Sequence, residues 1–156
     1  MIRHLSLSNG HYLDDLRLHT SPTILSDIDL STIDSSDLLP DSIADDGPKA
    51  TAGQALSKWL NIPRSDGKPK QLSCYDLSEP PNTKWITNFK EAFLRATISA
   101  NYVIRIEYFE STPIEPFELV NDRTNEMLTL EQEENDDANM DEDDDDAIVS
   151  TRIGPN

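Results

Sequence analysis

The sequence predicts an α+β fold, with a small core of two helices and an antiparallel hairpin between acidic disordered flanks. Three observations lead to this prediction. Both tryptophans and all four phenylalanines lie between residues 59 and 117, and aromatic side chains supply much of the burial energy of a small core. Only 36% of the residues are hydrophobic, and the net charge is -17. Such a composition lies between those of globular and disordered chains.

The charges divide the chain into three segments. Residues 131–146 hold 11 of the 30 acidic residues and no base, whereas residues 49–105 hold 9 of the 13 Lys and Arg residues and only 4 acids. We therefore expect residues 1–48 to be an acidic, largely flexible segment, residues 49–122 to be the core, and residues 123–156 to be a disordered acidic tail. Direct binding of duplex DNA is not expected, because the acidic arms would compete with phosphates for the basic middle.

The N-terminal segment leaves alternatives open. Leu5 and Leu7 alternate as in a strand, whereas the leucines from 13 to 18 have helical spacing. Residues 21–48 mix aliphatic residues with Asp and Ser, which favours caps and turns over long helices. They read either as an acidic linker or as a partner-docking peptide. The anchors of that peptide would be Ile28, Leu30, Ile33, Leu38 and Leu39.

Two helices are predicted in the core. The first covers residues 51–62, where Thr51 and Gln54 have the spacing of a capping box and Pro63 ends the helix. The second follows a cap at Asn82 or Thr83 and runs to about residue 100. Its Trp85, Phe89 and Phe93 repeat every four residues and therefore form one apolar face.

A hairpin is predicted after the second helix. Ile104, Ile106 and Tyr108 alternate with polar residues, as in a half-buried strand. Ile114, Phe117 and Leu119 mark a second strand, which Pro116 makes an edge strand or a bulged one. These six apolar residues are the candidate partner-binding residues.

No catalytic, cofactor-binding or metal-binding set is evident. The spacing of the three histidines, at positions 4, 11 and 19, fits no common metal motif, and the single Cys74 has no histidine near it in sequence. The glycines form no phosphate-binding loop. The chain has neither a long apolar run nor a signal-peptide core, so we expect a non-enzymatic intracellular protein, nuclear or cytoplasmic, that does not enter membranes.

Several hydroxyl residues have the sequence context of kinase substrates. Ser26, Ser31 and Ser42 each have an aspartate three residues downstream, and Ser21 and Thr112 precede prolines. A phosphate at such a position would add a large local negative charge.

Residues 82–120 resemble part of a HORMA domain, the domain of meiotic chromosome-axis proteins and spindle-checkpoint adaptors. In this comparison Trp85 and Phe89 lie on the helix, and Ile104 and Ile106 on the first strand. Ile114, Glu115, Phe117 and Leu119 match the second strand. The long apolar N-terminal helix and the C-terminal wrapping strands of that family have no counterpart here. The resemblance therefore implies a reduced HORMA-like protein of meiotic or checkpoint chromosome biology.

Together these patterns predict a protein-binding adaptor or complex subunit with protein partners. It would dock a partner on the exposed hairpin edge or on the helix face, and its acidic arms would steer the association. The alternative is an acidic inhibitor that mimics nucleic acid and blocks a DNA-binding protein. A mimic of this kind needs its carboxylates on a rigid surface, whereas the densest acidic run, residues 131–146, is predicted to be disordered.

Overall fold

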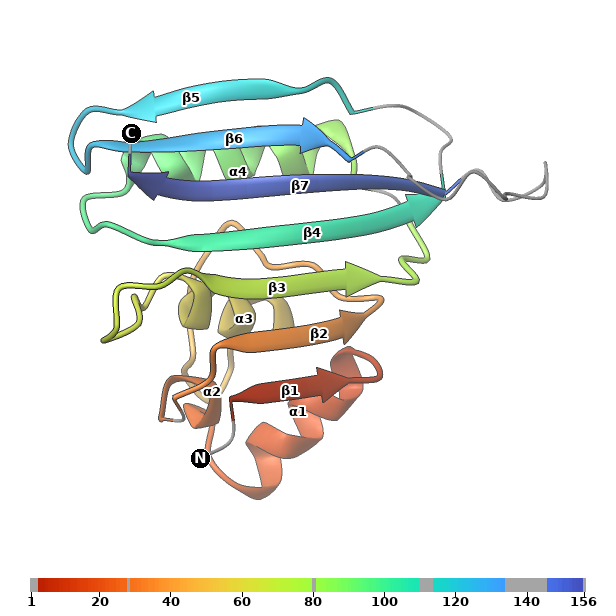
Figure 1. The fold of residues 1–156 in the computed structure, drawn as a ribbon. Helices are drawn as coiled ribbons and strands as arrows, with labels where there is room; N and C mark the ends of the chain where they lie inside the picture. Colours follow the sequence, from red (N-terminus) through yellow and green to blue (C-terminus); the bar gives the residue numbers. More distant parts are fainter. Residues whose placement is uncertain (1–2, 28, 80, 110–113, 134–145, 156) are drawn as a thin grey trace.

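A computed structural model describes residues 3–27, 29–79, 81–109, 114–133 and 146–155, and shows one mixed sheet with helices on a single face (Figure 1). The strands are β1 (His4–Leu7), β2 (Thr32–Ser36), β3 (Lys70–Tyr75), β4 (Tyr102–Phe109), β5 (Phe117–Asn121), β6 (Glu126–Gln132) and β7 (Asp146–Pro155). The helices are α1 (Gly10–His19), α2 (Ile24–Asp27), α3 (Ala52–Leu60) and α4 (Thr83–Arg95). The strand order across the sheet is β1-β2-β3-β4-β7-β6-β5.

The first four strands form a parallel half. They lie side by side in chain order. A parallel connection must cross one face of the sheet, and it usually does so as a helix. The crossovers between these strands contain α1 with α2, then α3, then α4. Crossovers of the same hand between strands in sequential order place all these helices on the same face, as Figure 1 shows.

The last three strands form an antiparallel half. β5 and β6 pair through the turn between Asn121 and Glu126, in which Asn125 has a φ of 55°. Asparagine tolerates this left-handed conformation better than most residues. β7 then pairs with β6 on one side and with β4 on the other, so it joins the two halves of the sheet.

The parallel strands end in a repeated local pattern. Ile33 lies opposite Leu72 and Ser35 opposite Cys74 in the register of β2 and β3. An aspartate with positive φ follows each strand: Asp37 at 52° and Asp76 at 49°. The carboxylate of Asp37 accepts hydrogen bonds from the backbone nitrogen and the hydroxyl of Ser78, which lower its pKa. The loop after β2 is thereby tied to the loop after β3.

The core extends under the whole sheet. Inward-facing residues from both ends of the chain are fully buried, and they belong to the same cluster as the aromatic residues of the middle. From the flanks these residues include Leu7, Leu13, Leu25, Leu30, Ile33, Leu128, Leu130, Val149 and Ile153. The opposite face of the sheet is polar, with pairs such as His4–Asp34 at 3.2 Å and Arg105–Glu133 at 3.0 Å.

The predicted fold class is therefore wrong. The chain is not a two-helix core with a hairpin, because β4 and β5 do not pair and the hairpin of the structure joins β5 to β6. The flanks are not wholly disordered either: β1, α1, α2 and β2 come from residues 1–48, and β6 and β7 come from residues 123–156. Strands from all three predicted segments lie in one sheet.

Several local predictions agree with the structure. The helix of residues 51–62 appears as α3, and its capping box is formed by Thr51 and Gln54. The second helix starts at the predicted cap, Asn82, but ends at Arg95 instead of about residue 100. Both patterns of the first 20 residues are present, as β1 and then α1. Leu30 and Ile33 are core residues, not exposed anchors, Leu38 and Leu39 are partly buried, and Ile28 lies outside the described residues.

Candidate functional site

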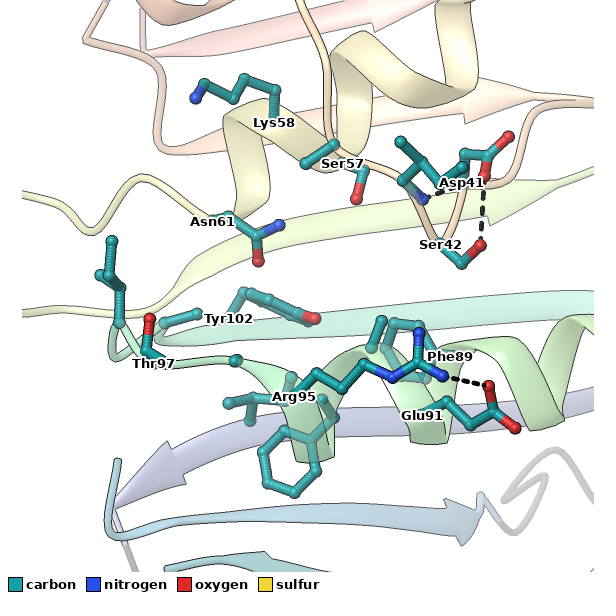
Figure 2. A pocket seen from close by; sticks show the side chains of 18 of the residues that line it. Asp41, Ser42, Ser57, Lys58, Asn61, Phe89, Glu91, Arg95, Thr97 and Tyr102 are labelled. Atoms are coloured by element: carbon teal, nitrogen blue, oxygen red, sulfur yellow. Dashed lines mark hydrogen bonds and ion pairs between the residues drawn. The ribbon is translucent and has the colours of Figure 1, made fainter. Parts of the chain in front are cut away.

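A groove with a volume of about 890 Å³ lies between α3 and α4. In Figure 2, Ser57, Lys58 and Asn61 of α3 and its C-cap lie on one side, with Phe89, Glu91 and Arg95 of α4 on the other. Tyr102 lies between them on the sheet. Volumes of this size are typical of ligand-binding clefts, which are mostly apolar with a few polar groups.

The floor of the groove is the sheet itself. Tyr102 at the start of β4 and Ile153 of β7 line it, and both are only 4% exposed. These two residues are paired neighbours in the sheet, so the floor lies where the parallel and antiparallel halves meet. On the α4 side, Phe89, Ala92, Phe93 and Ala96 add an apolar wall.

The rim carries exposed isoleucines. Ile43, in the loop between β2 and α3, is 62% exposed, and Ile98, in the loop after α4, is 73% exposed. Both line the groove. Large exposed aliphatic side chains beside an apolar groove mark a surface that can bury more apolar area on contact with a ligand or partner.

The α3 wall is fixed by a close approach of the preceding loop. The backbone nitrogen of Asp41 donates to the carbonyl oxygen of Gly53, at 3.0 Å. A Cβ at position 53 would lie only 3.0 Å from the carbonyl oxygen of Leu39. Glycine therefore lets the loop of residues 39–44 pack against the start of α3 and form one end of the groove.

The α4 wall is held at both ends. At the N-terminus, the Asn82 side chain caps the helix by accepting from the Trp85 backbone nitrogen, and the Trp85 indole donates to the Pro40 carbonyl oxygen at 2.9 Å. At the C-terminus, buried Asn121 donates to the carbonyl oxygens of Phe93 and Ala96, at 2.7 and 2.9 Å. These bonds satisfy carbonyl groups that the end of a helix leaves without partners.

Two ionisable groups lie at the base of the groove. Burial raises the pKa of the Glu126 carboxyl, and the Ala100 backbone opposes this shift by hydrogen bonding to the carboxylate. Burial, together with the Glu126 charge, also raises the pKa of the Tyr102 hydroxyl. The Tyr102 hydroxyl is therefore neutral near pH 7, and a neutral hydroxyl can donate or accept a hydrogen bond but carries no charge.

The rim also carries charges of both signs. Arg95 pairs with Glu91 at 3.1 Å on α4, and Lys58 lies on α3. Asp41 lies on the loop at one end, with its carboxylate bonded to the Ile43 backbone nitrogen at 3.1 Å. Asp41, Glu91 and Arg95 are exposed and Lys58 is partly exposed. These groups can therefore select a partner by charge without the cost of burying an unpaired ion.

Among the described residues that line the groove, the Ser42 hydroxyl lies 3.4 Å from the carboxylate of the neighbouring Asp41. The three histidines are exposed on β1 and α1 and do not line the groove. Cys74 is buried in β3, and burial raises the pKa of its thiol to about 12, which keeps it protonated and unreactive. Within the described ranges no group of three His, Cys, Asp or Glu residues is placed to hold a metal ion.

The structure places the six candidate partner-binding residues mainly in or against the core. Ile104 and Ile106 are fully buried, Tyr108 is 3% exposed, and β4 has a neighbouring strand on each side. Ile114 is also buried, whereas Phe117 and Leu119 are partly buried on β5. β5 is an edge of the sheet, so the edge character predicted from Pro116 belongs to this strand.

Sequence reasoning did not identify the groove. The apolar face of α4 was recognisable from its spacing, but periodicity does not show that part of that face stays uncovered. Ile43 and Ile98 are single isoleucines in polar loops, so the only available signal was their isolation. The acidic run of residues 131–146, which the alternative of a nucleic-acid-mimicking inhibitor would use, falls largely on residues 134–145, outside the described residues.

Comparisons with protein-family models, curated proteins and solved structures gave no significant match. They therefore do not bear on the resemblance to HORMA domains. No helix in the described part of the chain is long and apolar enough to span a lipid bilayer.

Proposed function

We propose that this chain is a non-enzymatic adaptor that binds a basic amphipathic helix of a partner protein in the groove between α3 and α4. The observation that carries the proposal is the groove itself, a gap in the helix layer with an apolar floor and exposed isoleucines at its rim. A helix with one apolar face is the element that fills such a gap elsewhere in this fold. Helix-in-groove docking is a common mode of peptide recognition.

The size of the groove fits this occupant. A helix about 10 Å across that rises about 5.4 Å per turn occupies on the order of 850 Å³ in two turns. The groove measures about 890 Å³. Two turns present apolar side chains at positions i, i+3, i+4 and i+7, enough to cover Tyr102 and Ile153 on the floor and to meet Ile43 and Ile98.

The charge of the chain favours a basic partner. The net charge of -17 attracts basic proteins and repels acidic ones at long range. At short range the rim offers the carboxylates of Asp41 and Glu91, of which Glu91 pairs with Arg95. Basic residues flanking the apolar face of the partner helix would therefore both speed association and fix its orientation.

The broader setting of the proposal comes from the sequence. From the HORMA resemblance we propose that the adaptor acts in meiotic or checkpoint chromosome biology in the nucleus. The groove-binding proposal does not depend on this expectation.

The test is to select peptides from a displayed library that bind the wild-type chain in the presence of a competing variant whose groove is blocked. A library of helical 14-residue peptides is panned against the wild-type chain with excess Ala92→Trp protein present, because a tryptophan at position 92 fills the groove. Thr87→Trp, on an exposed position of the same helix that does not line the groove, is the matched control.

We expect basic amphipathic sequences that bind the wild-type chain and Thr87→Trp alike and bind Ala92→Trp at least tenfold more weakly. Circular dichroism and urea unfolding show whether both variants are folded. Peptides that bind all three proteins equally would contradict the proposal, as would a selection that yields no helical consensus.

A further inference from the structure

We infer that Ser42 is a phosphorylation site that strengthens the binding of basic partners at the groove. The regulatory half of this inference rests on the proposed function, whereas the modification itself does not. In the reaction, a serine kinase that selects acidic residues after its target transfers the γ-phosphoryl group of ATP to Ser42 Oγ. The hydroxyl proton is released and ADP leaves.

The position of Ser42 is the first argument. Ser42 lies in the loop between β2 and α3, is half-buried, and lines the groove beside Asp41 and Ile43 (Figure 2). The loop is anchored to α3 on both sides of the serine: Asp41 donates to Gly53 at 3.0 Å and Asp45 donates to Gln54 at 3.2 Å. Between these anchors the chain is neither helix nor strand, as a kinase requires of a segment that it must bind in an extended form.

The structure also separates Ser42 from the other serines with an aspartate three residues downstream, which are Ser26, Ser31 and Ser73. Ser73 lies within the inner strand β3. The Ser26 hydroxyl donates to Asp46 at 2.8 Å, and the Ser31 hydroxyl donates to the Arg3 carbonyl oxygen at 2.8 Å. The backbone of Ser31 is also bonded to Arg3 and to Gln71 of β3, so it is held between two strands. The Ser42 hydroxyl makes only a long contact of 3.4 Å with the neighbouring Asp41.

The local charge supplies the recognition signal. Asp45 and Asp46 follow Ser42 at positions +3 and +4, and Asp45 is exposed. A kinase with a basic substrate cleft reads such carboxylates through charge-assisted hydrogen bonds.

The consequence follows from the charge of the phosphate. A phosphoserine carries about -1.5 to -2 charges near pH 7 and three acceptor oxygens. At position 42 it would add to the Asp41 and Glu91 carboxylates that also line the groove. Arginine binds phosphate with two parallel hydrogen bonds, so a basic helix in the groove gains contacts that it lacks on the unmodified chain.

The first experiment maps the modification on the full chain. The protein is incubated with ATP and a purified acid-directed serine kinase, and the modified residue is located by peptide mass spectrometry. We expect one phosphate, on Ser42, which is lost in Ser42→Ala, kept in Ser26→Ala and Ser31→Ala, and added several-fold more slowly to Asp45→Asn. The asparagine keeps an acceptor for the Gly47 backbone nitrogen, so that loop bond is preserved. Phosphate on another residue with Ser42 unmodified would overturn the site.

The second experiment measures the regulation. The affinity of a selected basic helical peptide is compared for phosphorylated and unmodified protein, at low and high salt. We expect binding five- to tenfold tighter after phosphorylation, a gain that shrinks at high salt and is absent in kinase-treated Ser42→Ala. Unchanged or weaker binding by a protein shown to carry the phosphate would overturn the regulation.

The two failures are distinguishable. If no basic peptide binds the unmodified groove, the proposed function fails. The assignment of the phosphate to Ser42 is tested separately, by mass spectrometry alone.

Discussion

The parallel and antiparallel halves of this sheet differ in how their strands are connected. Every step from β1 to β4 crosses the face of the sheet and brings a helix with it, whereas β5 and β6 are joined by a short turn. Four helices are therefore distributed over seven strands in the described chain. α4 lies over the antiparallel half, where Asn121 next to the β5–β6 turn holds its last turn.

This difference explains where the groove lies. α3 packs against α1 and α2 on the parallel half, while α4 packs against β5 at the far edge of the antiparallel half. The helix layer is consequently thin over the junction of β4 and β7, which leaves Tyr102 and Ile153 as the floor of the groove. The candidate site is a consequence of topology, since antiparallel connections contribute no helices of their own.

Each half of the sheet has a buried polar side chain that hydrogen-bonds to backbone carbonyl groups of its loops or helix ends. Arg17 is the one whose removal should cost the most stability. This residue on α1 is only 6% exposed, and its guanidinium donates to the carbonyl oxygens of Pro22, Gly47 and Ala50, at 3.0, 2.8 and 2.7 Å. Arg17→Ala leaves these carbonyl groups without their donor, and we expect it to lower the free energy of unfolding by about 3 to 4 kcal/mol.

Urea unfolding checks this value, with Arg95→Ala as the control. Arg95 is exposed and pairs only with Glu91, so its loss should change the stability by about 0.5 kcal/mol or less. Similar small losses for both variants would show that Arg17 does not organise the N-terminal loops.

In the antiparallel half the corresponding support is Asn121, and its effect should be smaller. Asn121→Ala removes the donor to the last turn of α4 and the acceptor for the Arg123 and Thr124 backbone nitrogens. We expect a loss of about 2 kcal/mol and faster amide exchange in the last turn of α4. The control is Asp122→Ala, a change at the exposed neighbouring residue. Equal amide exchange rates at the end of α4 in both variants would show that Asn121 does not hold this end of the groove wall.

Lys70, at the start of β3, gives the smallest expected effect, which appears as a dependence on pH. Burial over the Trp59 ring lowers the pKa of Lys70 from 10.5 to about 8. Between these values the unfolded chain binds more protons than the folded chain at this site. The contribution of Lys70 to the free energy of unfolding therefore increases as the pH rises from about 8 toward 10.5.

The comparison with Lys70→Met isolates this effect. Cys74 acts in the opposite direction, because its thiol ionises near pH 9 only when the chain is unfolded. It acts equally in both proteins and cancels in their difference. We expect the free energy of unfolding of the wild type, relative to that of Lys70→Met, to increase between pH 8 and 9.5. Parallel curves of unfolding free energy against pH would show that the Lys70 pKa is not lowered.

In the middle of the molecule the sequence predicts α3, α4 and β4, because their signals are local, but it misses β3 and wrongly pairs β4 with β5. The capping residues Thr51 and Asn82 start α3 and α4, and the alternation from Tyr102 to Tyr108 marks β4. The flanks were misread because their acidic composition outweighed short strand patterns. Leu128 and Leu130 alternate with polar residues in β6, and Val149 and Ile153 face the core in β7 on either side of Thr151. The acidic run lies between these two strands.

Some of the fold had no local signal. Ser35 and Thr151 face the core and are fully buried, because Ser35 donates to the Leu38 carbonyl oxygen and Thr151 to that of Thr129. A polar residue that faces the core interrupts the alternation of apolar and polar residues from which a strand is predicted. The insertion of β7 between β4 and β6 is a long-range pairing that no local pattern specifies. The groove depends on this insertion, so it was beyond prediction for the same reason.

The most direct test is amide hydrogen exchange on the full chain, because the account requires both flanks to belong to one sheet. β2 and β7 are inner strands that come from the two acidic flanks. We predict that the amides of residues 32–36 and 149–153 exchange as slowly as those of β3 and β4, within about tenfold. Exchange of these residues at the rate of an unstructured peptide, with β3 and β4 protected, would contradict the seven-stranded sheet and the groove that depends on it.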